Sequence, residues 1–98
     1  MESKTIFVTG TTQGIGKITA TALAKQGHHI IIHGRSKSKL LAVQEEIKKE
    51  TGNNNVDIAV ADLLSMTDIK RMADELKAKY DSLDVLINNA GAIFNKER

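Results

Sequence analysis

Three glycines within residues 9–16 stand at a spacing that suits close contact with a phosphate group: Gly10, Gly14 and Gly16 form the pattern G-x-x-x-G-x-G. Gly10 permits a backbone turn that a Cβ would obstruct, while Gly14 and Gly16 let the main chain approach a pyrophosphate closely. A helix that starts here would add unpaired N–H groups and the positive end of its dipole. The whole turn is therefore the candidate phosphate site: Gly10, Thr11, Thr12, Gln13, Gly14, Ile15 and Gly16.

The polar side chains inside this turn, those of Thr11, Thr12 and Gln13, can add hydroxyl or amide hydrogen bonds to the anion. The alternative is that glycines between a strand and a helix only make a tight connection, which is the better interpretation of a lone glycine pair. Three spaced glycines after a predicted strand and before a predicted helix favour phosphate binding over that alternative.

Arg35 and Ser36 follow the second predicted strand. In dinucleotide-binding folds an acidic residue about 20 positions after the glycine turn accepts a hydrogen bond from the ribose when NAD is preferred. No acid is available at that distance. Arg35 would instead make charge-assisted hydrogen bonds to a 2′-phosphate, with Ser36 as a further donor. The pair predicts NADP(H) over NAD(H), the alternative being that Arg35 is a solvated charge at a helix start.

Strands and helices are expected to alternate along the chain. Short β-branched runs predict the strands, and apolar residues at three- and four-residue spacing predict the helices. The first helix has its apolar stripe at Ile15, Ile18, Ala22 and Leu23. The strands are expected at residues 5–8, 29–33, 56–61 and 84–88, and the helices at residues 14–26, at residues 36–50, and after a cap at Ser65 with a stripe of Ile69, Met72, Leu76 and Tyr80.

This alternation indicates an α/β fold with a parallel sheet, because a crossover helix returns the chain to the same end of the sheet. We expect a Rossmann-like doubly wound sheet, truncated, with strand order 3-2-1-4 and a reversal between the first and fourth strands. Ligands bind at such a reversal. With no proline and no linker composition, residues 1–98 are expected to form a single dinucleotide-binding domain.

Composition argues against several other functions. A net charge of +2 and only three aromatic side chains do not suit nucleic-acid binding. The absence of cysteine excludes thiol redox chemistry and fits a cytoplasmic protein. No apolar run approaches the roughly 20 residues of a membrane span, and no signal peptide is evident. The histidines His28, His29 and His33 lack the carboxylate pattern of a metal site.

Three segments together resemble the short-chain dehydrogenase/reductase family. Residues 9–16 match its T-G-x-x-x-G-I-G motif, Asp62 and Leu63 stand where that family holds the adenine ring, and residues 88–91 reproduce its N-N-A-G segment. The resemblance implies that Asp62 accepts from the adenine amino group and that Leu63 offers its N–H and an apolar surface. The alternative for Asp62 is a local role in the loop before the next helix. Backbone contacts to the ribose and nicotinamide side are implied for Asn89, Ala90 and Gly91.

The same resemblance bears on the cofactor and on catalysis. NADP-preferring members carry an arginine like Arg35, although the position before the second glycine, often basic in them, is Gln13. The family transfers hydride between nicotinamide and a carbonyl or alcohol, using a tyrosine, a lysine, a serine and an asparagine. Tyr80 is the only tyrosine in this sequence, and Asp84 stands four positions on, so there is no Y-x-x-x-K pattern.

We therefore expect the NADP(H)-binding part of a longer oxidoreductase, unable to turn over alone because it lacks the acid/base group. The alternative is a non-catalytic NADP(H)-binding or regulatory module. A small-molecule substrate would bind only to the full-length parent, and these residues do not identify it. An exposed sheet edge or face predicts self-association.

Overall fold

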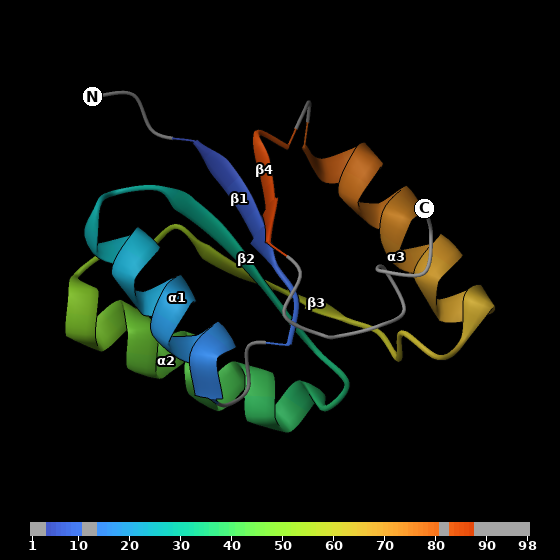
Figure 1. Cartoon of the computed structure of the whole chain (residues 1–98), viewed down its shortest axis with the longest axis horizontal. Helices are drawn as coiled ribbons and strands as arrows, with labels where there is room; N and C mark the ends of the chain where they lie inside the picture. Colours follow the sequence, from blue (N-terminus) through green and yellow to red (C-terminus); the bar gives the residue numbers. More distant parts are fainter. Residues whose placement is uncertain (1–3, 11–13, 81–82, 88–98) are drawn as a thin grey trace.

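The computed structural model of the chain describes residues 4–10, 14–80 and 83–87. Strands and helices alternate as the sequence predicts (Figure 1). Where the expected bounds differ from the observed ones, they differ by one residue, and Asn88, expected to end the fourth strand, lies outside the described residues. The strands are β1 (Thr5–Val8), β2 (His29–Gly34), β3 (Val56–Val60) and β4 (Val85–Ile87), and the helices are α1 (Gly14–Lys25), α2 (Lys37–Thr51) and α3 (Met66–Lys79).

The four strands form one sheet in the order β3-β2-β1-β4, and every pair is parallel. Ile6 of β1 is in register with Ile30 of β2 on one side and with Val85 of β4 on the other. The chain therefore runs outward from β1 to β3 and then returns to the far side of β1. This confirms the α/β Rossmann-like fold and the predicted strand order, and it places the end of β1 at the reversal.

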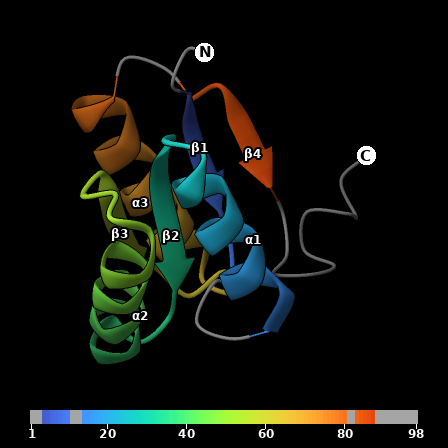
Figure 2. The same ribbon diagram turned by 90° about the vertical axis from the view of Figure 1, so that its left-hand side faces the viewer.

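Helices cover both faces of the sheet, α1 and α2 on one face and α3 on the other (Figure 2). Successive strand residues point to opposite faces, so each face receives its own core. Val8 and Ile32 belong to the cluster beneath α1 and α2. Phe7 and Ile31 belong to a second cluster that includes Met72 of α3. Burial on both sides explains why β2 is a run of isoleucines rather than an apolar-polar alternation.

The sequence predicts the wrong apolar face for α1. Ile15 and Ile18 are 73% and 70% exposed, Ala22 is also exposed, and only Leu23 packs partly against the core. The buried face consists instead of small residues four positions apart: Gly16, Ala20 and Ala24. Small residues let the helix lie close to the sheet, and they form a helical stripe as regular as that of the larger side chains.

Serine caps fix the starts of the other two helices. Ser36 Oγ accepts a hydrogen bond from the N–H of Lys39 at 3.3 Å, and Ser65 Oγ accepts one from the N–H of Asp68 at 3.2 Å. Each cap satisfies an N–H group that the helix itself leaves unpaired. With the helices starting at these caps, only short loops separate them from the strands before them, and these loops carry Arg35 and Asp62.

Of the helices in the described ranges, none has both the length and the apolar character needed to cross a membrane.

Candidate functional site

The glycine turn joins the end of β1 to the first residue of α1, at the reversal in strand order. Gly10 and Gly14 have φ values of 62° and 67°, in the left-handed region that non-glycine residues avoid. Apart from its chain neighbours and its own helix backbone, no atom of the described residues lies within 4 Å of a Cβ built on Gly14. Gly14 is therefore glycine because of its backbone conformation, and the space in front of it is open.

The first turn of α1 offers the positive end of the helix dipole, and Lys17 within it is paired with Glu46 of α2 at 2.7 Å. No acidic residue stands in that turn. Gly14 and Ile15 are exposed there, whereas Gly16 is buried on the face against the sheet, where it allows close packing. An anion placed before the helix would meet unpaired N–H groups and the positive end of the dipole. Thr11, Thr12 and Gln13 lie outside the described residues.

Hydrogen bonds tie the end of β1 to its neighbours on both sides. The N–H of Thr9 donates to the carbonyl of Ile87 on β4 at 3.0 Å. On the other side, the N–H of Gly10 donates to Nδ1 of His33 on β2 at 3.1 Å. The start of the glycine turn is therefore held by both strands that flank β1.

Arg35 and Ser36 lie together directly after β2. The Arg35 side chain is exposed and forms no ion pair with the part of the chain that the structure describes. Ser36 is occupied as the cap of α2, and its hydroxyl also lies 3.2 Å from that of Ser38. Arg35 is thus available to an external anion. The Ser36 hydroxyl could also bind the anion, but it would do so while capping α2.

Asp62 takes part in a local network before α3. Its Oδ1 accepts from the N–H of Leu64 at 2.9 Å, and its own N–H donates to Oδ2 of Asp68 at 3.0 Å. Asp62 therefore does have a local role in the loop before α3, the alternative given above. Its Oδ2 has no partner among the described residues. Leu63 is 7% exposed and belongs to the core beneath α3. Its backbone is the part left for a ligand.

His33 is a residue that the sequence did not single out as part of the site. Its ring is 3% exposed, and besides accepting from Gly10 it donates from Nε2 to the carbonyl of Ala61 at 2.9 Å. Burial lowers the pKa of His33, against the opposing effect of the bond to Ala61. A signal was present, because a polar residue inside a buried strand needs hydrogen-bond partners.

A second polar cluster lies at the opposite edge of the sheet. Asp57 Oδ2 accepts from the hydroxyl of Tyr80 at 2.6 Å and lies 2.9 Å from Nε2 of His29. Burial by itself would raise the pKa of Asp57, but these hydrogen bonds and the charges of His29 and Lys79 lower it below its usual value. Burial and the neighbouring carboxylate raise the pKa of Tyr80. Tyr80 therefore fastens the end of α3 to the sheet and is held in its protonated form.

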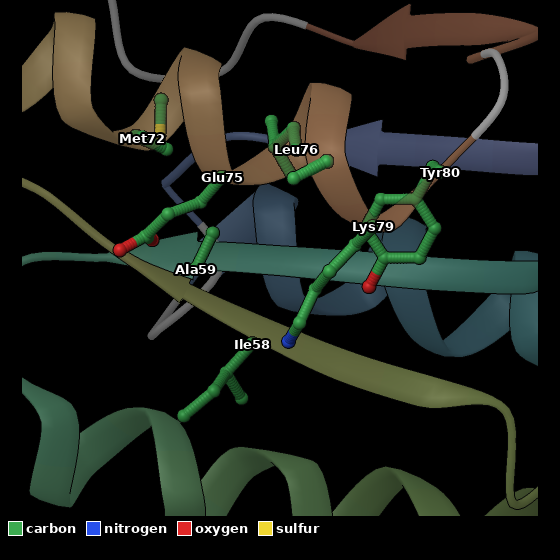
Figure 3. A pocket seen from close by; sticks show the side chains of 8 residues that line it. Ile58, Ala59, Met72, Glu75, Leu76, Lys79 and Tyr80 are labelled. Atoms are coloured by element: carbon green, nitrogen blue, oxygen red, sulfur yellow. The ribbon is translucent and has the colours of Figure 1, made fainter.

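A hollow of about 350 Å³ lies between α3 and β3 (Figure 3). Half of the eight residues around it belong to the core beneath α3, and none of the residues assigned to the cofactor lines it. The residues that line it are Ile58, Ala59, Met72, Glu75, Leu76, Ala78, Lys79 and Tyr80. No group of three side chains suited to a metal ion occurs within residues 4–10, 14–80 and 83–87.

The structure thus gathers the first glycines, Arg35 and Asp62 at the carboxyl edge of one sheet, where the ends of β1, β2 and β3 meet. The predicted contacts Asn89, Ala90 and Gly91 lie outside the described residues. The arrangement can present backbone N–H groups and the exposed Arg35 guanidinium to an extended anionic ligand.

Known proteins share both the sequence and the fold. The family model for short chain dehydrogenases matches residues 4–98. Human polyprenol dehydrogenase is 46% identical over 92 residues, which cover 94% of this chain and 28% of that protein. A short-chain dehydrogenase from Shigella flexneri 2a, complexed with NADP, has a TM-score of 0.82 at 32% identity, covering 94% of this chain and 39% of that one.

A second solved structure extends the comparison to a different enzyme. L-sorbose reductase from Gluconobacter frateurii, complexed with NADPH and L-sorbose, has a TM-score of 0.83 at 26% identity. The alignment covers 94% of this chain and 35% of the reductase. The chain therefore spans well under half the length of these proteins. With the family model matched from residue 4 to residue 98, the chain belongs to the short-chain dehydrogenase/reductase family.

Proposed function

We propose that this chain is the NADP(H)-binding part of an oxidoreductase that transfers hydride between nicotinamide and a carbonyl or alcohol. The observation that carries the proposal is the open glycine turn at the strand reversal, with Gly14 in the left-handed region and empty space in front of it. The pyrophosphate would lie against this turn and the start of α1.

The preference for NADP(H) over NAD(H) rests on Arg35. Its guanidinium is exposed, unpaired by any described carboxylate, and placed after β2 where the adenosine ribose would lie. A 2′-phosphate would gain charge-assisted hydrogen bonds from it, with the Ser36 hydroxyl as a further partner. Two of the solved relatives are complexes with NADP or NADPH, which supports this assignment.

Other residues would contact the adenine at one end of the ligand and the nicotinamide side at the other. Asp62 Oδ2 would accept from the adenine amino group, and the Leu63 N–H would lie beside the ring. Asn89, Ala90 and Gly91 would contact the ribose and nicotinamide side. Residues 1–98 would form one dinucleotide-binding domain, and the serine, tyrosine and lysine that complete the reaction would come from the rest of the parent protein.

The test is calorimetric titration with NADPH, NADH and 2′-phospho-ADP-ribose. NADPH and 2′-phospho-ADP-ribose should bind more tightly than NADH, because only they carry the 2′-phosphate. Arg35→Asp should weaken NADPH binding by about ten- to a hundredfold, since a hydrogen bond to a charged group contributes about 1.5–3 kcal/mol. NADH binding should change far less.

Lys49→Asp is the matched control, because it makes the same change of charge at the far end of α2, where Lys49 is exposed. It should leave the preference for NADPH intact. Equal affinity of the chain for NADPH and NADH, or an unchanged preference in Arg35→Asp, would remove the role given to Arg35. No binding of any of the three ligands would refute the proposed function.

A further inference from the structure

His33 stands where it can connect the two ends of the candidate site. It occupies the second-last position of β2, the strand that lies between β1 and β3. Its side chain lies on the same face as that of Phe7, whose ring meets the imidazole edge-on at a centroid distance of 6.2 Å. Because the ring is almost fully buried, its polar atoms depend on protein partners.

Two such partners belong to the neighbouring strand ends. The N–H of Gly10, the first glycine of the turn after β1, donates to Nδ1 at 3.1 Å. The carbonyl of Ala61, the residue before Asp62, lies 2.9 Å from Nε2. A backbone N–H can only donate and a carbonyl can only accept. The ring is therefore neutral, with Nδ1 bare and the proton on Nε2.

This arrangement spans the ligand proposed above. Gly10 begins the turn assigned to the pyrophosphate, and Ala61 precedes the residue assigned to the adenine. One rigid ring fixes the separation between them and satisfies the part-buried N–H of Gly10 and the buried carbonyl of Ala61. It also directs the Gly10 N–H inward, so the N–H groups that meet the phosphates must come from later in the turn. Such preorganisation favours binding because the free chain already holds the bound geometry.

We propose that His33 is a positioning residue that sets the distance between the pyrophosphate turn and the adenine loop, without itself touching the ligand. The proposal rests on the proposed function, since it presumes a dinucleotide bound along this edge. Substituting His33 should therefore lower the affinity for ligands that reach both strand ends and should leave the affinity for ligands that reach only one of them unchanged.

Two substitutions separate the two hydrogen bonds. In His33→Asn, Oδ1 replaces Nδ1 as the acceptor for Gly10, but nothing reaches Ala61. In His33→Gln, the amide nitrogen replaces Nε2 as the donor to Ala61, but the Gly10 N–H loses its acceptor. Each variant should weaken 2′-phospho-ADP-ribose, which spans the adenine and the diphosphate, by about three- to tenfold, the range of one hydrogen bond. Binding of adenosine 2′-monophosphate, which reaches only the adenine and Arg35 side, should be unchanged.

His28→Gln is the matched control. His28 lies at the other end of the same stretch, is also buried, and accepts from the N–H of Lys4 through Nδ1 at 3.1 Å. The control should lower the unfolding midpoint as His33→Gln does and leave both ligand affinities unchanged. A general structural role for His33 would instead weaken the two ligands equally or neither of them.

Nitrogen NMR of the unmodified free chain tests the bridge without any ligand or variant. The two hydrogen bonds require the Nε2–H tautomer of His33. A proton on Nδ1, or full affinity for 2′-phospho-ADP-ribose in both His33 variants, would overturn the proposal. If the unmodified chain binds no dinucleotide, the proposed function and the positioning role both fail, although the tautomer would still show whether the bridge exists.

Discussion

Replacing Gly14 by alanine separates the conformational role of this residue from its role in binding. An alanine at position 14 would have to adopt the φ of 67° found for Gly14, and this left-handed conformation costs a non-glycine residue about 1–2 kcal/mol. The smaller entropy of the unfolded chain offsets about 0.4–1 kcal/mol of this. Because the Cβ meets no atom within 4 Å, no clash adds to the strain. We expect a net loss of about 1 kcal/mol, or a fall of about 4–8 °C in Tm.

The effect on binding should exceed the effect on stability. The open space in front of Gly14 is where the pyrophosphate is proposed to approach, so the methyl group would displace it from the backbone N–H groups. Losing one charge-assisted hydrogen bond is worth about 1.5–3 kcal/mol, so NADPH affinity should fall by about ten- to a hundredfold. Calorimetric titration at a temperature well below the unfolding transition measures this affinity without interference from unfolding.

Gly52→Ala is the control for this experiment. Gly52 ends α2 with φ of 73° and also has nothing within 4 Å of a built Cβ, so it should lose about the same stability. It lies away from the candidate site and should bind NADPH as the unmodified chain does. Equal affinity in Gly14→Ala and Gly52→Ala would refute the argument that the open glycine turn holds the ligand.

Three further results are expected. At neutral pH, Tyr80→Phe should unfold more easily than the unmodified chain, because the hydroxyl that stabilises the Asp57 carboxylate is gone. The difference should shrink as the pH falls, since the lowered pKa of Asp57 stabilises the fold only while Asp57 is ionised. Urea unfolding at several pH values checks this. Ser65→Ala should lower the free energy of unfolding by about 1 kcal/mol through loss of the α3 cap, measured by thermal melting. Val85 is 37% exposed on the edge strand β4, and we propose that this sheet edge supports self-association, so Val85→Lys should reduce the sedimentation coefficient at high concentration.

The order and type of the elements could be read from the sequence because the two periodicities are distinct. The run of isoleucines at residues 30–32 is typical of a strand buried on both faces, and Ser65 with Asp68 three positions on indicates the cap before α3. The strand order followed from right-handed crossovers together with the usual order of the nucleotide-binding fold. The choice of the buried face of α1 could not be predicted, because Gly16 and Ala20 lie on a stripe as regular as that of Ile15 and Ile18.

The candidate site was predictable where it depends on backbone and not where it depends on contacts between distant residues. The glycine spacing indicated the turn, and the structure gives Gly10 and Gly14 the positive φ that only glycine adopts readily. The bridge made by His33 joins residues 23 and 28 positions away, which no local pattern encodes. The link from Asp57 to Tyr80 is likewise long-range, at 23 positions.

The most direct test of the central claim is an NMR titration of the chain with NADPH, following backbone amide shifts. The claim is that the turn between β1 and α1 receives the dinucleotide diphosphate. If the turn receives the diphosphate, the largest shifts will occur at the amides of residues 11–16, with smaller ones near Arg35 and Asp62. Shifts concentrated around the hollow between α3 and β3, with the turn unaffected, would contradict it.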